Sequence, residues 1–470
     1  MLFRSYSGDY SGKRHSPLTQ ITPANVKRLA AQWTFQAETL ALNRGFEATP
    51  IAVDGVLYIT GSFNYAWALD ARTGRPFWRY KRDLPNNLTY GASAPVNRGF
   101  GILGDRLFMV TLDAHLLAMD RKTGAILWDV VLEDYRVGYS ATLAPLIVKD
   151  KVIVGISGGE YATRGFIDAY DPATGKRIWR THSIPGAGEP GSETWPNVEA
   201  AKRGGGGTWM TGSYDPELNL IYWGTGNPAP WTPQSRSGLD GLYASTLLAI
   251  RPKTGEIAWH YQYTPNDVWD VDGTDEPVLA DITFEGKPRK VLFQMNKSGF
   301  GYTLDRATGQ LLAAHPFTRV NWATHIDLKT GRPVINQELY AQIVKGDEVH
   351  VYPQRGVNAV PIAYNPNKGL IYTSSWAIPR IFRVELPIKT PPHGGRSTGT
   401  IARAYQAKPG EVVGHHIAFD PLTGKKKWEI PLVDRANSAG MLATGGGLLF
   451  TGDVNGKFRS EEHTSEPSHV

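Results

Sequence analysis

The chain has 470 residues, of which 41% are hydrophobic, with 51 glycines, 32 prolines and a formal net charge of +6. This composition excludes a disordered chain and is typical of a folded protein with many turns. No run approaches the ~18 apolar residues of a membrane helix, and the scattered basic residues do not favour nucleic-acid binding. The absence of cysteine excludes disulfides, thiolate metal sites and c-type haem attachment within these residues.

The first residues carry few structural signals. Residues 1–10 lack the basic region and apolar core of a signal peptide, so none is expected within this chain. Helical periodicity is scarce along the sequence. The best candidate for a helix is the segment 21–31, with Thr22 as its N-cap.

A repeated motif organises the chain. Six segments carry Asp or Arg, any two residues and Thr-Gly, and in five of them Trp stands four positions after the Gly. Their threonines are Thr73, Thr123, Thr174, Thr254, Thr308 and Thr423, and in the fifth copy Ala313 replaces the Trp. An Asp carboxylate can cap the amides of such a turn, where Gly supplies a positive φ. A chance run of hairpin turns would not keep Trp at one fixed offset.

The spacing of the copies indicates the fold. The first three threonines lie about fifty residues apart, which is the size of one four-stranded propeller blade. The recurring indole is large enough to wedge between neighbouring sheets. Wider gaps before Thr254 and Thr423 imply insertions or a degraded blade. The sequence therefore predicts an all-β fold of the β-propeller type.

The C-terminal segment departs from the repeat. Residues 447–458 begin another blade, but the expected Asp-x-x-Thr-Gly turn does not follow. Residues 459–466 instead resemble the translation of a sequencing adapter, and the alternative is a natural polar tail. We expect residues 1–458 to form a single propeller domain with an incomplete last blade, and residues 459–470 to be a non-native tail. A propeller hides its sheet edges by closing its ring, so this chain is expected to be poorly stable.

Polar residues at the ends of apolar strands are the candidates for a site. Glu160 follows a Gly pair, Asn227 follows another apolar strand, and Asp267, Asp270 and Asp272 stand within six residues. In extended backbone, residues two apart project to one side, so Asp270 and Asp272 can aim at the same point. Carboxylates with an amide oxygen suit calcium or a similarly hard ion, and not zinc. Taken alone, Glu160 could be a surface carboxylate, and Asn227 or Asp267 could be a turn former.

Together with Gly204 to Gly207 and Trp209, these residues resemble the pyrroloquinoline-quinone (PQQ)-dependent alcohol dehydrogenases in order and spacing. The resemblance covers nearly all of residues 5–458 and implies an eight-bladed β-propeller whose last blade is incomplete here. It assigns the metal ligands Glu160, Asn227, Asp270 and Asp272, and makes Asp270 the catalytic base. Asp272 looks like the mark of lanthanide-using members, because calcium-using members carry a small residue there. The alternative is that Asp272 only caps the turn at Gly273.

The resemblance also implies a set of quinone contacts, namely Glu47, Arg98, Thr142, Ser157, Trp209, Lys297 and Asn358. The chemistry of PQQ agrees with these residue types, because a tricarboxylate suits cations and hydroxyl donors and a planar ring suits an aromatic face. The alternatives are that Arg98 and Lys297 are surface charges and that Trp209 is another wedge between sheets. A phosphate-binding role for the Gly run is rejected, because no Gly-Lys-Ser/Thr or strand–loop–helix context accompanies it.

Two departures from the family pattern concern the cofactor pocket. Ala92 and Ser93 stand where the family commonly has adjacent cysteines that form a disulfide ring over the quinone. Ala359 follows Asn358 where many members have Trp. Both departures imply that the walls of the pocket differ in this chain.

The function implied by the resemblance is oxidation of a primary alcohol to an aldehyde by bound PQQ. A lanthanide ion, or Ca²⁺ as the alternative, would act as the Lewis acid. Electrons would pass to a soluble cytochrome c in the periplasm. No nucleic-acid partner is expected, and the protein could be a monomer or a homodimer. The alternative from another class is a non-enzymatic propeller scaffold of the outer-membrane assembly lipoprotein type. A third reading is an enzyme that oxidises sugars or polyvinyl alcohol.

Overall fold

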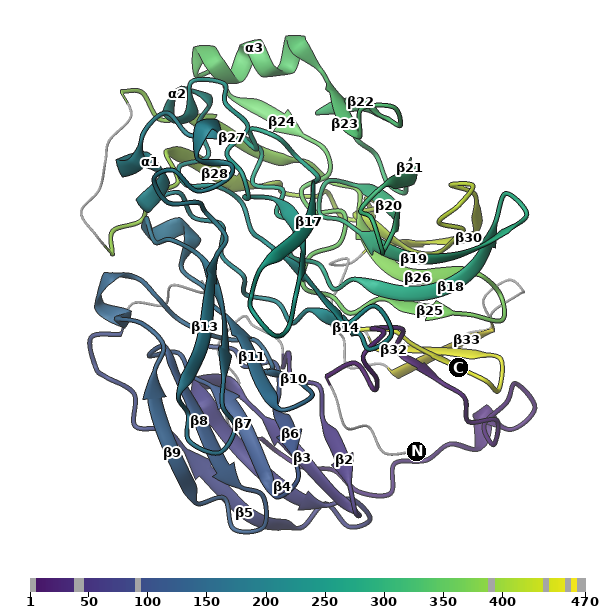
Figure 1. The fold of residues 1–470 in the computed structure, drawn as a ribbon. Coiled ribbons are helices and arrows are strands. Elements are labelled where there is room, and N and C mark those ends of the chain that lie inside the picture. Colours follow the sequence, from purple (N-terminus) through teal and green to yellow (C-terminus); the bar gives the residue numbers. More distant parts are fainter. Residues whose placement is uncertain are drawn as a thin grey trace.

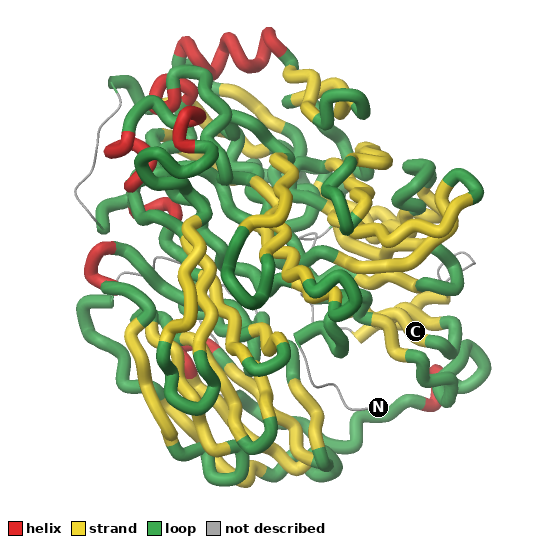
Figure 2. The backbone as a smooth tube through the Cα atoms, viewed as in Figure 1, coloured by secondary structure: helices red, strands yellow, loops and turns green. Residues whose placement is uncertain are grey.

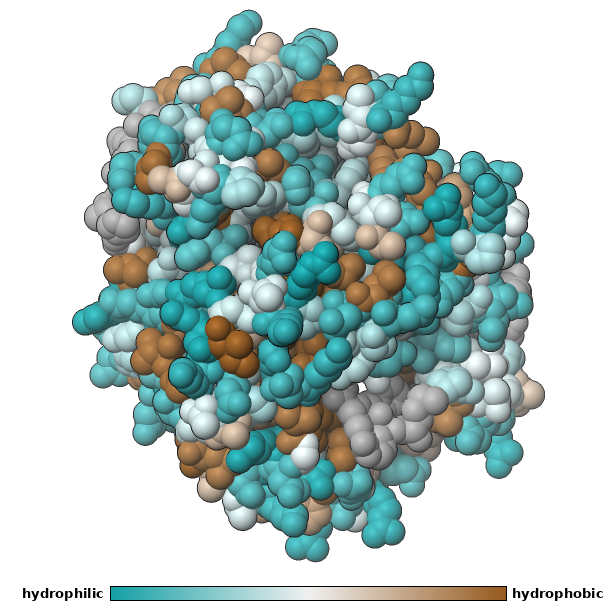
Figure 3. Space-filling view, viewed as in Figure 1, coloured by the Kyte–Doolittle hydropathy of each residue, from teal (hydrophilic) through white to brown (hydrophobic). Residues whose placement is uncertain are grey.

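The computed structural model describes residues 6–37, 46–88, 94–387, 394–433, 439–452 and 458–462. Seven four-stranded sheets follow one another in chain order around the molecule (Figure 1). Strands and connecting loops make up most of the chain (Figure 2), and the face in Figure 3 is mostly hydrophilic with scattered apolar residues. None of the described helices is long and apolar enough to cross a membrane. The predicted all-β propeller class is confirmed.

Three sheets come from the first half of the chain. They comprise β2 (Ile51–Val53), β3 (Val56–Thr60), β4 (Tyr65–Asp70) and β5 (Pro76–Lys81); β6 (Gly101–Leu103), β7 (Arg106–Val110), β8 (His115–Asp120) and β9 (Ile126–Val131); and β10 (Leu146–Val148), β11 (Lys151–Gly155), β12 (Phe166–Tyr170) and β13 (Arg177–His182).

Three further complete sheets follow. They comprise β14 (Ser213–Asp215), β15 (Leu220–Gly224), β16 (Thr246–Ile250) and β17 (Ile257–Gln262); β18 (Val278–Phe284), β19 (Lys287–Met295), β20 (Phe300–Asp305) and β21 (Leu311–Pro316); and β25 (Ala363–Asn365), β26 (Leu370–Trp376), β29 (Gly414–Phe419) and β30 (Lys426–Leu432). The seventh contains β31 (Leu442–Thr444), β32 (Leu448–Gly452) and β33 (Phe458–Glu462), with β1 (His15–Ser16) on its edge.

Smaller elements join the sheets. A hairpin of β22 (Ala323–Asp327) and β23 (Arg332–Ile335) and a three-stranded sheet of β24 (Val349–Val351), β27 (Arg380–Val384) and β28 (Thr400–Ala404) lie outside the seven sheets. The helices α1 (Val198–Lys202), α2 (Pro233–Arg236) and α3 (Gln337–Lys345) lie at one end of the molecule (Figure 1). The 3-10 turns are η1 (Val26–Arg28), η2 (Ser62–Asn64), η3 (Tyr135–Val137), η4 (Gly159–Tyr161) and η5 (Ser192–Thr194).

The repeated motif forms the turn before each outer strand. In the first copy, Asp70 Oδ1 accepts hydrogen bonds from the backbone N–H groups of Arg72 and Thr73 at 2.8 and 3.0 Å. The same carboxylate cap recurs in the other copies that carry Asp, at Asp120, Asp171, Asp305 and Asp420. Gly74 closes the turn with a φ of +71°. The predicted turn chemistry is confirmed.

Four of the five indoles of the repeat, those of Trp78, Trp128, Trp179 and Trp259, pack on the turn of the next sheet along the chain. A Cβ placed on Gly124 would lie 2.8 Å from the Trp78 ring, and Trp78 Nε1 donates to the Arg121 carbonyl at 3.0 Å. The wedge predicted from the sequence is therefore confirmed. In the fifth copy, where Ala313 replaces Trp, the ring of His315 takes the equivalent position, 2.6 Å from a Cβ on Gly424.

The last sheet differs from the other six. Its strands β31, β32 and β33 pair antiparallel, while β1 joins β31 in a parallel pair. The strand that follows the Thr-Gly turn in the other six sheets has no counterpart among the described residues of this sheet. Residues 459–462 of the adapter-like segment belong to β33, and residues 463–470 lie outside the described residues.

The helix predicted over residues 21–31 is wrong. Only the 3-10 turn η1 forms there, and its N-cap is Asn25 instead of Thr22. Ile21 and Leu29 remain 37% and 48% exposed, and Val26 is buried. Short helices owe most of their stability to an apolar face packed on the protein, and this segment has no such face.

Candidate active site

The loops before the innermost strands bring the first group of predicted residues together. Arg98 donates to Glu47 Oε2 at 2.7 Å and to Thr142 Oγ1 at 2.6 Å. Its guanidinium carbon lies 5.1 Å from the centroid of the Trp209 ring. Arg98 is only 6% exposed, so the alternative of a surface charge is wrong. Three other predicted quinone contacts, Glu47, Thr142 and Trp209, thus surround the buried guanidinium of Arg98.

Several polar atoms of the predicted quinone contacts are buried without a hydrogen-bond partner in the described part of the chain. They are Ser157 Oγ, Arg98 Nε and Asn358 Oδ1. Buried polar groups in folded proteins nearly always have a partner, so unpaired groups at one set of loops need an explanation. A planar polyanion that binds there would supply acceptors for the two donors, and these residues therefore fit PQQ.

The glycine run explains how the site is assembled. Gly205 and Gly206 have φ values of +78° and +65°, and a Cβ on Gly205 would lie 2.9 Å from the Ala229 nitrogen. Gly206 N–H donates to the Asn227 carbonyl at 2.9 Å. The run therefore lets the backbone pass against the Asn227 loop before it reaches Trp209, whose ring is not one of the wedges of the repeat. Close backbone packing therefore explains the glycines without a role in phosphate binding.

The acidic turn differs from the extended segment that the sequence predicted. Asp270 and Asp272 have φ values of +57° and +58°, in the left-handed region. Asp267 winds the turn, because its carboxylate accepts from the Trp269 and Val271 N–H groups, each at 2.9 Å. Asp tolerates the left-handed region better than most residues. Asp267 is therefore the turn former, and the turn presents the other two carboxylates.

Lys297 bridges these two carboxylates. Its Nζ lies 2.8 Å from Asp272 Oδ2 and 3.2 Å from Asp270 Oδ1, and it is 7% exposed, so it is not a surface charge. Burial opposes its charged form, but Asp270 and Asp272 outweigh burial and raise the pKa of Lys297.

Asp272 Oδ1 accepts from Asn227 N–H at 3.0 Å. The Gly273 N–H donates to the Thr225 carbonyl at 2.8 Å, so the interpretation of Asp272 as its cap is wrong.

Glu160, in the turn η4, faces the same acidic turn. Burial, together with the charges of Asp270 and Asp272, raises the pKa of Glu160 to about 7. Burial and the two nearby carboxylates thus outweigh the opposing charge of Lys297 at Glu160. Among the described residues, no group of three or more Asp, Glu and His side chains is close enough to hold a metal as it stands. The donor set fits a hard cation in chemistry, and the ammonium of Lys297 lies between two of its members.

Arg380 is a site residue that the sequence did not reveal. It forms a short ion pair with Asp270, and its guanidinium carbon lies 4.7 Å from the centroid of the Trp231 ring. Burial would raise the pKa of Asp270, but Arg380 and Lys297 outweigh it and lower that pKa. Arg380 stands 110 positions after Asp270, on the sheet outside the propeller, and no local motif marks it.

Arg236 and Asp275 support the site and were also missed. Arg236 is fully buried and donates to the Pro230 carbonyl at 2.5 Å and to the Asp267 carbonyl at 2.6 Å. It thereby joins the Asn227 loop to the acidic turn. Asp275 Oδ2 accepts from the Lys297 N–H at 3.1 Å, which fixes the backbone of that lysine. No local motif in the sequence marks Arg236.

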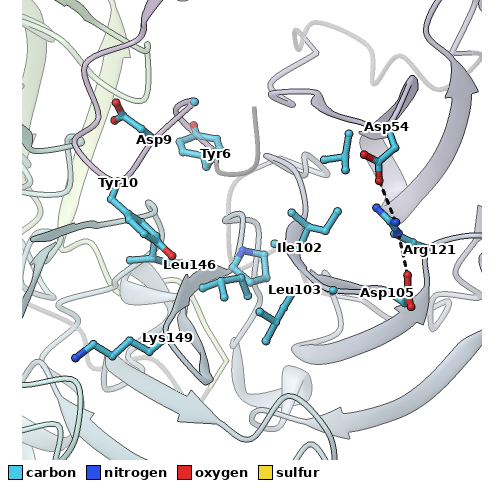
Figure 4. Close-up of a pocket in the computed structure, with 16 residues that line it drawn as sticks. Tyr6, Asp9, Tyr10, Asp54, Ile102, Leu103, Asp105, Arg121, Leu146 and Lys149 are labelled. Carbon is cyan, nitrogen blue, oxygen red and sulfur yellow. Dashed lines mark hydrogen bonds and ion pairs between the residues drawn. The ribbon is translucent and has the colours of Figure 1, made fainter. Parts of the chain in front are cut away.

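A cavity of about 580 Å³ lies away from these residues (Figure 4). It is lined by Asp54, Asp105 and Lys149, which follow β2, β6 and β10, whereas the site residues precede the same strands. The cavity therefore lies at the opposite end of the strands from the site. Arg121 pairs there with Asp54 at 3.1 Å and Asp105 at 3.3 Å.

Ala92 and Ser93, which replace the adjacent cysteines of the family, lie outside the described residues. The prediction that the wall of the cofactor pocket differs there stays a prediction. Ala359 is described, with a φ of +59°.

Comparison with known proteins gives consistent matches. Residues 3–321 match the PQQ family model described as "Glucose/ethanol/alcohol dehydrogenase, beta-propeller domain". The quinohemoprotein alcohol dehydrogenases ADH IIB and ADH-IIG of Pseudomonas putida are 39% and 38% identical over 97% and 95% of this chain. The chain spans 67% and 65% of their lengths, about two thirds.

Two lanthanide-containing relatives also match. The lanthanide-dependent methanol dehydrogenase of Methylacidiphilum fumariolicum is 37% identical over 96% of this chain and 77% of its own length. A solved structure of a europium-containing methanol dehydrogenase matches with a TM-score of 0.91 at 35% identity. That match covers 98% of this chain and 83% of the solved chain.

Proposed function

This chain belongs to the PQQ-dependent alcohol dehydrogenases, and from that premise we propose that it oxidises primary alcohols to aldehydes with bound PQQ and one hard metal ion. The observation that carries the proposal is the position of Asp270. Its carboxylate is 8% exposed and is held between Lys297 and Arg380, which keep it ionised. A buried, ionised carboxylate beside a cofactor site is suited to general base catalysis.

The residues around Arg98 would hold the quinone. Arg98, Thr142 and Ser157 offer charged and hydroxyl donors to its carboxylates, and Trp209 offers a face for its ring. PQQ, when bound, would supply the acceptor for the hydride of the alcohol carbon, and the metal would supply Lewis-acid assistance. Glu47 pairs with Arg98 and so fixes the orientation of the guanidinium.

Asp270 would take the hydroxyl proton of the alcohol. Lys297 and Arg380 orient its two oxygens, because each cation contacts a different one. The removal of this proton favours loss of hydride from the adjacent carbon, and a positioned base contributes roughly 10²–10⁴-fold to such a step. The Asp270 side chain is 10% exposed, which limits the contact of its carboxylate with bulk water.

Glu160, Asn227, Asp270 and Asp272 would hold the metal, and we place a lanthanide ahead of Ca²⁺. Three carboxylates carry more negative charge than a divalent ion neutralises, and Lys297 and Arg380 pair with two of them in this structure. A trivalent ion of similar size would balance the charge and accept the same oxygen ligands. The match to a lanthanide-dependent and a europium-containing methanol dehydrogenase supports the same choice.

We further propose a periplasmic enzyme that passes electrons to a soluble cytochrome c. The quinohemoprotein names of two relatives support a haem acceptor for this chemistry. We also propose that residues 1–458 form one PQQ-binding domain and that residues 459–470 are not native. The scaffold and the sugar-oxidising alternatives are disfavoured, because the site residues converge and the similar curated proteins reported above are alcohol or methanol dehydrogenases.

Reconstitution tests the proposal. The purified chain, incubated with PQQ and lanthanum, should reduce an artificial dye when ethanol is added. Omission of PQQ or metal should abolish the reduction. Absence of dye reduction with any primary alcohol, despite bound PQQ, would contradict the proposed activity.

A further inference from the structure

A small recess adjoins Asp270. Its apolar walls come from Trp269, Val271, Trp322, Val351 and Pro353. The polar part of the lining comes from Asp270, Lys297, Ser298, Gln354 and Arg380. The free volume is about 10 Å³, room for roughly one water molecule, while Arg380 pairs with Asp270. An alcohol that reaches Asp270 through this recess must therefore meet the guanidinium of Arg380.

Arg380 is held firmly in this position. It begins β27 and pairs in register with Val351 of β24. The sheet β24–β27–β28 is linked to the Asn227 loop, because the backbone N–H of Trp231 donates to the backbone carbonyl of Thr398 at 2.8 Å. The guanidinium also stacks on the Trp231 ring, at 4.7 Å from its centroid. An Arg held by stacking loses less side-chain freedom when it binds a ligand.

The donors of Arg380 are mostly unused. A guanidinium carries five N–H donors, and within the described part of the chain the hydrogen bond that it makes is to Asp270. Its side chain is 16% exposed and is part of the lining of the recess. A monohydric alcohol would offer them only the lone pairs of the oxygen whose proton goes to Asp270, whereas a second substrate oxygen would be a separate acceptor.

We propose that Arg380 is a specificity-determining residue that binds a second oxygen of the substrate, on the carbon next to the carbinol. The enzyme would then prefer vicinal diols and other 2-oxygenated primary alcohols to plain alkanols. Asp270 and Arg380 are in contact, so the two adjacent oxygens of a diol can meet the carboxylate and the guanidinium together. A site built to hydrogen-bond a substrate hydroxyl discriminates strongly against analogues that lack it. The inference rests on the proposed alcohol oxidation and names its substrate class.

The test compares ethane-1,2-diol with ethanol in wild type, Arg380→Met and Arg380→Lys, each loaded with PQQ and lanthanum. We expect the ratio of kcat/KM for diol over ethanol to fall about tenfold or more in Arg380→Met, as for loss of a charged hydrogen bond. Arg380→Lys should keep part of the preference. Because the ratio is taken within each variant, a general loss of Asp270 function cancels.

Arg319→Met is the matched control. Arg319 also lies over an aromatic ring, 3.8 Å from the centroid of Tyr352, but it is exposed and has no contact with Asp270 among the described residues. The ratio should not change in this variant. An unchanged ratio in Arg380→Met would overturn the inference and leave Arg380 as a counter-ion of Asp270.

A binding experiment separates this inference from the proposed activity. 2,3-Dimethylbutane-2,3-diol and tert-butanol have no hydrogen on the carbinol carbon, so neither can be oxidised by hydride loss. Saturation-transfer NMR should show the diol, and not tert-butanol, on wild type, with the diol signal lost in Arg380→Met. Equal diol signals in both proteins would overturn the inference. If no alcohol is oxidised, the proposed activity fails while this experiment still decides the role of Arg380.

Discussion

The ammonium group of Lys297 lies 2.8 Å from Asp272 Oδ2, although the two residues stand 25 positions apart. The same group lies 3.2 Å from Asp270, so one buried cation holds two proposed metal ligands. Removal of one partner from a buried ion pair typically costs about 3–5 kcal/mol, because the other charge is left uncompensated.

Replacement of Lys297 by Met should therefore destabilise the metal-free protein by about 3 kcal/mol. Added lanthanum should recover part of this loss, because the ion supplies the missing positive charge. Thermal melting with and without lanthanum measures both effects. A variant as stable as wild type without metal would show that the carboxylates do not depend on Lys297.

Replacement of Asp270 by Asn should abolish most turnover while the bound quinone remains. The amide keeps the shape and one oxygen of the side chain but cannot accept the hydroxyl proton, so kcat should fall roughly 10²–10⁴-fold. Dye reduction measures turnover, and the quinone absorbance measures cofactor binding. Asp105→Asn, at the opposite end of the strands, is the control. Turnover equal to wild type in Asp270→Asn would contradict its role as the base.

Replacement of Asp272 by Ala should remove a preference for lanthanides over calcium. The variant has one carboxylate fewer, so a divalent ion then balances more of the remaining charge. The metal-stripped proteins would be titrated with lanthanum and calcium in parallel, and dye-reduction rates compared. Wild-type rates with calcium that equal or exceed those with lanthanum would refute the lanthanide proposal.

His182 predicts a pH dependence of stability remote from the site. Burial, together with Arg164 and Arg180, lowers the pKa of His182 from 6.5 to about 4. The folded state thus disfavours the charged ring, so stability is complete above pH 6.5 and is lost as pH falls from 6.5 towards 4. Partial solvent screening keeps the loss below about 3 kcal/mol. In His182→Gln, the midpoint of urea denaturation should change less with pH between 6.5 and 4 than in wild type. The same pH dependence in both proteins would exclude His182 as the cause of the stability loss.

The local sequence determined the repeating unit of this protein. Asp70 caps amides two and three residues away, and Gly74 is its near neighbour, so the turn depends on adjacent residues alone. The motif therefore predicted the sheets and the position of each Trp. The exchange at Ala313 was not predictable in the same way, because His315 fills the gap only through contact with Gly424, on another sheet.

The resemblance to a family identified the site residues, and the tertiary structure decided how they act together. The left-handed turn at Asp270 depends on caps from Asp267, where extended backbone was predicted. Arg380 reaches Asp270 from a sheet 110 positions further along the chain. Sequence patterns report contacts within a few residues, whereas charge pairing in a buried site depends on loops that only the packed sheets bring together.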